Sequence, residues 1–90
     1  MERKDIKTIL KTPYPDILDF ALSLVKLTDK ELEAITYVDI KGNTEERTAE
    51  ILDVSPRHIQ DLRARAYKKL SKIWSSHKFI NIYLEMEKKD

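Results

Sequence analysis

Apolar residues recur at helical spacing along most of the chain, and this periodicity predicts a series of short helices. Ile6, Ile9 and Leu10 mark a first helix within residues 2–11, which the prolines of "TPYP" bring to an end. A second helix is expected over residues 15–26. It is apolar around much of its circumference, so we expect it to be buried or covered by a partner.

A capping box marks the third expected helix. Thr28 is followed three residues later by Glu31, a pattern typical of a helix start, and Gly42 is the expected stop. The buried stripe of this helix is expected to consist of Leu32, Ile35 and Val38.

A tight turn, "DVS", joins the fourth and fifth expected helices. The fourth is short and is capped by Asn43 or Thr44. In the turn, Asp53 occupies the position that needs a left-handed backbone, which aspartate tolerates. Ser55 as N-cap and Pro56 at the first helical position then predict the start of a long helix.

The helix predicted over residues 56–75 has two different faces. At about 100° per residue, its apolar arc and its basic side chains lie nearly opposite each other. The expected core arc is Ile59, Leu62, Ala66, Leu70 and Ile73. The outer face and its flanks are Arg57, Gln60, Asp61, Ala64, Arg65, Lys68 and Lys72. Arg63 and Lys69 flank the arc, where their stems can cover apolar surface.

The expected fold is a small all-α domain of five to six helices that contains a helix-turn-helix. Residues 1–27 hold the N-terminal helices, 28–75 the helix-turn-helix, and 76–90 a last helix with a polar tail, all within one compact domain. The last helix carries Phe79, Ile80, Tyr83 and Leu84. Trp74, Phe79 and Tyr83 are expected in the core or at a partner contact.

Composition restricts the classes of function. The chain has no cysteine, which excludes disulfides and cysteine-based metal sites, and a cytoplasmic location is expected. No apolar run reaches the roughly 18 residues of a membrane span. His58 and His77 lack metal-ligand spacing, and Asp16 and Asp19 fit a helix N-terminus better than a catalytic dyad. We therefore expect no enzyme activity, no cofactor and no metal.

Net charge is only +1, but it is unevenly distributed. Residues 57–78 carry seven Lys or Arg against Asp61 alone, whereas residues 1–56 carry eight against 12 Asp or Glu. A concentrated basic segment is typical of nucleic-acid contact, although it can also be a solvated helix face. A short helix, a three-residue turn and a basic second helix together favour a DNA-binding helix-turn-helix over a structural hairpin.

The stretch "TEERTAEILDVSPRHIQDLRARAYKKL", residues 44–70, resembles region four of bacterial sigma factors, which reads the upstream promoter element. The family pattern has a Thr-led scaffold helix, a turn such as Asp-Val-Thr, and a recognition helix ending Ala-x-x-Lys-Leu. The preceding "LTDKELEAI", residues 27–35, also matches, so the resemblance covers about residues 27–73. It implies a DNA-binding transcriptional regulator that acts on double-stranded DNA.

The resemblance also places candidate contacts. The family's base-reading positions fall on Pro56, Arg57 and Asp61. Because proline cannot hydrogen-bond to a base edge through its side chain, the ordinary promoter element is not the expected target. The candidate base contacts are Arg57, Gln60 and Asp61, and the candidate phosphate contacts are Thr44, His58, Arg65, Lys68 and Lys72.

Two questions stay open at this level. Asp61 can accept from a cytosine, orient Arg57 or Arg65, or form a plain intrahelical ion pair. The chain can act on DNA alone, with RNA polymerase, or as a protein-interaction module that binds RNA polymerase or a sigma factor. It can also act as an oligomeric, phage-type DNA-binding subunit, with a homodimer formed through its N- or C-terminal helices.

Overall fold

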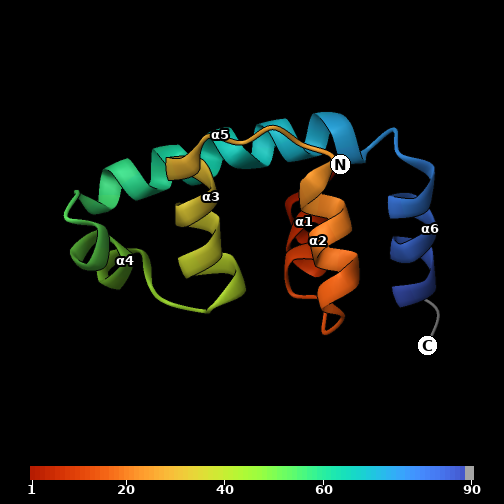
Figure 1. Ribbon diagram of the computed structural model, residues 1–90, viewed down its shortest axis with the longest axis horizontal. Coiled ribbons are helices and arrows are strands. Elements are labelled where there is room, and N and C mark those ends of the chain that lie inside the picture. Colours follow the sequence, from red (N-terminus) through yellow and green to blue (C-terminus); the bar gives the residue numbers. More distant parts are fainter. Residues whose placement is uncertain (89–90) are drawn as a thin grey trace. The chain divides into compact units, whose positions relative to one another are not determined.

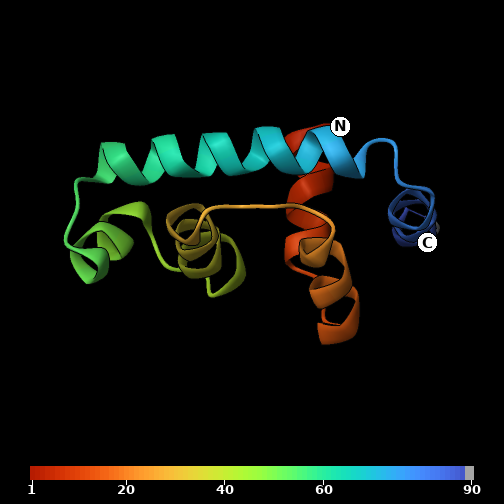
Figure 2. The ribbon, with the colours of Figure 1, turned by 45° about the horizontal axis from the view of Figure 1, so that its top comes forward.

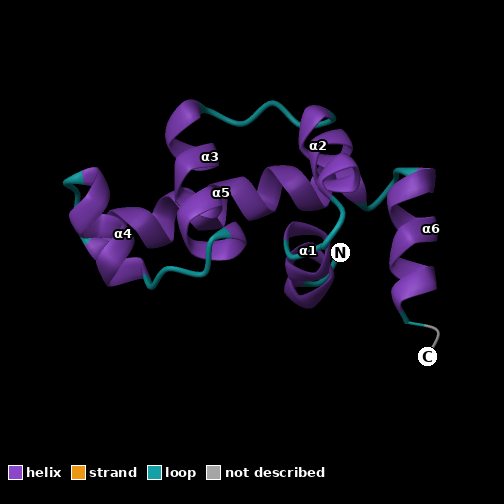
Figure 3. Ribbon diagram, turned by 60° about the horizontal axis from the view of Figure 1, so that its bottom comes forward, coloured by secondary structure: helices purple, strands orange, loops and turns teal. Residues whose placement is uncertain are grey.

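A computed structural model of the protein describes residues 1–88 and contains six α-helices, one π-helical segment and no strand in that range (Figures 1 and 3). The helices are α1 (Arg3–Leu10), α2 (Pro15–Ser23), α3 (Asp29–Ile35), α4 (Glu45–Leu52), α5 (Pro56–Trp74) and α6 (Lys78–Glu87), and the π-helical segment η1 is Thr36–Ile40. The predicted all-α class is confirmed. Residues 89–90, the end of the predicted polar tail, lie outside the described part. None of the described helices is both long and apolar enough to cross a membrane.

The chain divides into two units with separate sets of internal contacts. The central unit is Leu27–Lys68, and the terminal unit is Met1–Lys26 together with the chain from Lys69 onward. Helix α5 is uninterrupted and contributes its first part to the central unit and its last turns to the terminal unit (Figure 2). Each unit therefore has a core of its own.

In the central unit, the capping box that starts α3 is confirmed. The Thr28 hydroxyl accepts from the Glu31 N–H at 3.1 Å, and the Glu31 carboxylate accepts from the Thr28 N–H at 2.9 Å. At the other end, Gly42 has a φ of 80° and donates its N–H to the Val38 carbonyl, which confirms the predicted stop.

The predicted buried stripe of this segment is wrong in part. Leu32 is exposed and Val38 is only half-buried, whereas Ala34, Ile35 and Asp39 are buried. For Val38, the reason is the π-helical segment Thr36–Ile40: its wider turn shifts the register, so that Asp39 takes the inward position. Leu32 lies before this segment, and its exposure has no such explanation.

In the terminal unit, α1 packs against α2 and α6, and its apolar face of Ile6, Ile9 and Leu10 is fully buried as expected. Helix α2 is shorter than predicted and ends at Ser23 instead of continuing to residue 26. The Ser23 hydroxyl donates to the Phe20 carbonyl at 2.6 Å, a local bond that competes with continuation of the helix.

The core arc predicted for α5 is confirmed up to Leu70 and wrong at its last position. Ile73 is 38% exposed, whereas Trp74 is completely buried. The indole N–H of Trp74 donates to the Ala21 carbonyl at 2.9 Å, which satisfies its only polar group. The next buried position after Leu70 is therefore four residues later, at Trp74, and not three residues later, at Ile73. The larger indole side chain fills this part of the core of the terminal unit.

The last helix also differs from expectation at one aromatic residue. Ile80 and Leu84 are buried, and the half-buried Tyr83 shares a 2.7 Å hydrogen bond with Thr12. Phe79, in contrast, is exposed. Of the three aromatic residues expected in the core or at a partner contact, Phe79 is thus outside the core, and a partner contact for it stays a prediction.

The connection between α4 and α5 has the geometry that its sequence predicts. Asp53 lies in the left-handed region, with φ 56° and ψ 50°, and the Val54 N–H donates to the Ala49 carbonyl at 3.0 Å. The Ser55 hydroxyl accepts from the His58 N–H at 3.1 Å, and Pro56 follows as the first residue of α5. Three residues thus reverse the chain between the two helices.

Replacement of Asp53 tests the strain in this turn. Asp53→Gly should raise the free energy of unfolding by about 0.5 kcal/mol, and Asp53→Ala should lower it by about 1 kcal/mol, because only glycine adopts this backbone without a steric penalty. Urea unfolding followed by circular dichroism measures both. Gly42→Ala is the control for backbone strain alone, since an added Cβ there meets no atom within 4 Å. Equal stability of the glycine and alanine variants at position 53 would contradict the prediction.

Candidate nucleic-acid interface

A buried ion-pair network fixes α5 within the central unit. The Arg63 guanidinium donates to both carboxylate oxygens of Asp39, at 2.8 and 3.0 Å, and to Glu45 at 2.8 Å. The Asp39 side chain is only 4% exposed and that of Arg63 17%. A bidentate arginine–carboxylate contact of this kind fixes the relative orientation of the two side chains as well as their distance.

Tyr67 completes the network from one helical turn further along α5. Its hydroxyl donates to Asp39 at 2.7 Å, and the Arg63 guanidinium lies 5.6 Å from the centre of its ring. Burial, together with the bond to Asp39, raises the pKa of Tyr67 to about 12, so the phenol stays protonated as a donor at neutral pH. The hydrogen bond to Asp39 likewise raises the pKa of Arg63, which therefore remains charged.

The sequence pattern does not predict this network. It places Arg63 beside the core arc, whereas in the structure Arg63 carries the charge that neutralises the buried Asp39. The available signal was the pair Arg63 and Tyr67, which are four residues apart and hence on one side of the helix. Their partner Asp39 lies 24 residues before Arg63, and a spacing that long carries no local pattern.

The opposite face of α5 is open to solvent. Arg57, Asp61, Ala64, Arg65 and Lys68 are all exposed. The Arg57 Nε lies 3.5 Å from a carboxylate oxygen of Asp61, one helical turn away, in the intrahelical arrangement that the sequence left as one alternative. The pair is exposed, so it contributes little to stability.

Three further cations lie on the exposed side of α5. Arg65, Lys68 and Lys72 are exposed, and within residues 1–88 none of them takes part in an ion pair. Lys72 lies on the part of α5 that belongs to the terminal unit, whereas the other two belong to the central unit. The central unit thus presents Arg65 and Lys68 as uncompensated positive charge beside the Arg57–Asp61 pair.

The remaining candidate contacts are partly occupied by bonds inside the protein. Gln60 donates to the Glu45 carboxylate at 3.2 Å, so its amide is turned toward the first turn of α4. The Thr44 hydroxyl accepts from the Arg47 N–H at 3.0 Å as the N-cap of α4. His58 is half-buried and lines a small hollow of about 60 Å³ together with Val54, Leu62 and other residues. Their roles as base or phosphate contacts stay predictions.

Comparison with models of known families, with curated proteins and with solved structures returned no significant match. Among the described residues, no three His, Cys, Asp or Glu side chains are grouped closely enough to hold a metal ion.

Loss of the Arg63 side chain should destabilise the central unit strongly. Arg63→Met should lower the free energy of unfolding by about 3 kcal/mol, because it leaves the Asp39 carboxylate buried without a counter-charge. Urea unfolding measures the change. Arg65→Met, an exposed arginine two positions away, is the matched control and should change stability by less than about 0.5 kcal/mol.

A second substitution separates charge from packing. Asp39→Asn in the Arg63→Met background should recover more than half of the lost stability, because it removes the buried charge and keeps an acceptor for Tyr67. No recovery in the double variant would show that Arg63 acts by filling space instead of by neutralising Asp39.

Proposed function

We propose that α4 and α5 form a DNA-binding helix-turn-helix, with α5 as the recognition helix in the major groove of double-stranded DNA. The observation that carries this proposal is the division of charge on α5. One arginine, Arg63, is neutralised inside the unit, whereas Arg65 and Lys68 remain exposed and uncompensated on the other side. Positive charge concentrated on one accessible helix face is what contact with phosphates requires.

The local geometry supports the same function. The two helices are joined by three residues with a left-handed Asp53, and the small side chain of Ala49 is buried in α4, where a helix-turn-helix needs its helices to approach closely. Val54, Ile59 and Leu62 supply apolar surface on the inner side of the pair. The outer side of α5 is thereby kept free of any core function.

Each exposed residue on α5 suits a particular kind of contact. Arg57 can form a bidentate hydrogen bond to a guanine, and Asp61, one helical turn away, pairs with the Arg57 guanidinium. Ala64 is small and exposed between the longer side chains, so the helix backbone can come close to the base edges. Arg65 and Lys68 suit phosphates, which fix position without reading sequence.

We further propose that the module is of the sigma region-four kind. The resemblance of residues 44–70 supports this, and so does the position of Arg57 and Asp61 at two of the family's base-reading positions. Pro56 at the third such position argues for a target other than the ordinary upstream promoter element. The resemblance further implies cooperation with RNA polymerase, since region four of the family also contacts that enzyme.

Salt dependence of duplex binding tests the proposal. Arg65→Ala and Lys68→Ala should each weaken binding to every duplex and reduce the slope of log affinity against log salt by about 1, because each removes one phosphate contact. Fluorescence anisotropy of a labelled duplex over a series of salt concentrations measures both quantities. Lys4→Ala removes the same charge from α1 and should leave the slope unchanged. Absence of binding at low salt would rule out the DNA-binding function.

A substitution of Asp61 distinguishes base reading from general attraction. Asp61→Ala should raise affinity for a scrambled duplex, because an acid leaves a basic face. It should also lower the preference for a selected site roughly tenfold, since an oriented arginine–guanine contact contributes about 1–3 kcal/mol. The selected site comes from random-site selection with the wild-type protein, and anisotropy with both duplexes gives the ratio.

The matched control for Asp61 is Glu50→Ala. Glu50 is also an exposed acid paired with an arginine on its own helix, Arg47, at 3.2 Å. Its loss should leave the preference for the selected site unchanged. An unchanged preference in Asp61→Ala as well would show that Asp61 is an ordinary acid within the basic face.

A further inference from the structure

Helix α6 exposes an apolar ridge on the side opposite to its buried face. Phe79, Ile82 and Met86 are 65, 44 and 66% exposed, although all three are large and apolar. They follow each other at steps of three and four residues, the spacing of the seam through which two helices pack in a coiled coil. Ile80 and Leu84, on the inner side, are buried in the terminal unit. The ridge therefore has no function in the core of its own unit.

The ridge has a hollow on each side. An apolar groove of about 450 Å³ lies between α2 and α6, lined by Tyr14, Phe20, Tyr83 and the ridge itself. The His77 ring contacts Phe20 and Phe79, with ring centres 5.5 and 6.0 Å apart, and so links the groove to the start of the ridge. A second hollow of about 370 Å³ on α6 includes Lys78, Asn81 and Glu85 along with the ridge residues Ile82 and Met86.

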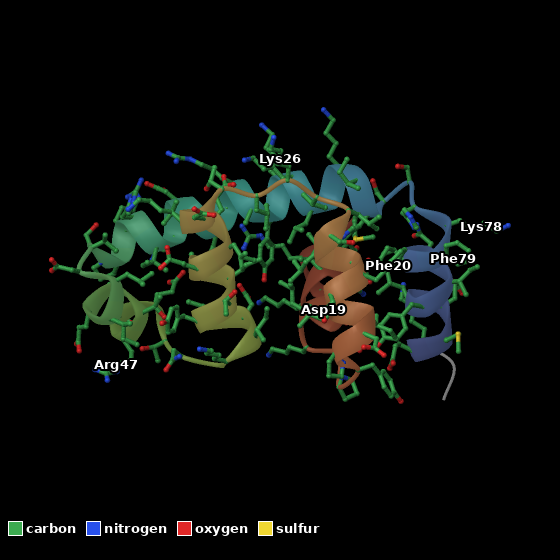
Figure 4. All side chains as sticks on the ribbon, in the orientation of Figure 1. Asp19, Phe20, Lys26, Arg47, Lys78 and Phe79 are labelled. Carbon is green, nitrogen blue, oxygen red and sulfur yellow. The ribbon has the colours of Figure 1, made fainter. Side chains whose placement is uncertain are left out.

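Two opposite charges, Lys78 and Glu85, line this second hollow. Lys78 and Glu85 are seven residues apart, so they lie on the same edge of the helix, two turns from each other. Within residues 1–88 neither forms an ion pair. Figure 4 shows the Lys78 side chain extended away from the helix, with Phe79 next to it on the outward side. Ile82 lies close to the midpoint between the two charges.

We propose that α6 is the interface of a homodimer, in which two copies of the helix pack antiparallel about a two-fold axis that passes near Ile82. In such a pair, Lys78 of each copy meets Glu85 of the other, because residues equally distant from the axis face each other. Both ion pairs form at once on the same edge of the interface. In a parallel pair of helices, neither Lys78 nor Glu85 would face an opposite charge at this edge.

The shape of the α6 surface, like its charges, favours a second copy of this chain as the partner. A two-fold interface has to be complementary to itself, with a protrusion and a recess on the same surface. The terminal unit has both, because the ridge lies between two hollows into which ridge side chains of the other copy can pack. The inference does not rest on DNA binding, since none of the residues involved belongs to the outer face of α5.

Charge reversal tests the dimer without altering the apolar ridge. Sedimentation velocity of the purified full chain, over a micromolar to millimolar concentration series, should show a monomer–dimer equilibrium. Lys78→Glu and Glu85→Lys should each raise the dimer dissociation constant roughly tenfold, because each places like charges together at two symmetric points. Both side chains are exposed, and circular dichroism shows whether the helices are retained.

Mixing the two variants decides the orientation of the helices. Chains with Lys78→Glu and chains with Glu85→Lys should form a heterodimer as tight as the wild-type dimer, because all four charges are then paired oppositely. Lys7→Glu, the same charge reversal on the exposed side of α1, is the control and should leave dimerisation unchanged. A monomer at every concentration, a dimer that the single variants do not weaken, or a mixture that does not recover would each overturn the proposal.

Discussion

A carboxylate that is almost fully buried must be neutralised by its surroundings, and Asp39 sets this condition for the central unit. It is met by two residues one turn apart on α5, Arg63 as counter-charge and Tyr67 as hydrogen-bond donor. Because Arg63 also reaches Glu45, the network connects the π-helical segment, the first turn of α4 and the middle of α5. Rotation of α5 about its axis would break all of these bonds together. The same network that holds the unit therefore decides which side of α5 is turned outward.

Local signals in the sequence were sufficient for most helix boundaries. The capping box at Thr28, the glycine stop at Gly42 and the left-handed Asp53 each depend on residues within one or two turns, and all three are present in the structure. The core arc of α5 was also predictable up to Leu70, because a 3.6-residue period is an intrinsic property of the helix. What these features share is that the backbone itself determines them, without any knowledge of what lies opposite.

The failures concern residues whose partners are distant in the chain. Because of the π-helical turn between Thr36 and Ile40, Asp39 and not Val38 points inward. No capping or spacing rule predicts such a turn. Trp74 and not Ile73 is buried in the core, where its indole N–H donates a hydrogen bond to the carbonyl of Ala21, 53 residues earlier. In the candidate site, the exposed positions on α5 followed from periodicity, but the bond from Gln60 to Glu45 did not. Which side chains meet across two helices depends on how the helices pack. The residue pattern of a single helix carries no information about that packing.

The two proposed surfaces are chemically opposite, and this has a consequence for any target on DNA. The outer face of α5 in the central unit is basic and exposed, whereas the ridge on α6 is apolar with one charge of each sign beside it. Apolar area supplies association that salt does not weaken, and basic side chains supply association that salt does weaken. A two-fold dimer carries two copies of α5 related by the same axis. A dimer of this kind that bound one duplex through both copies of α5 would read an inverted repeat, with one copy of Arg57 in each half.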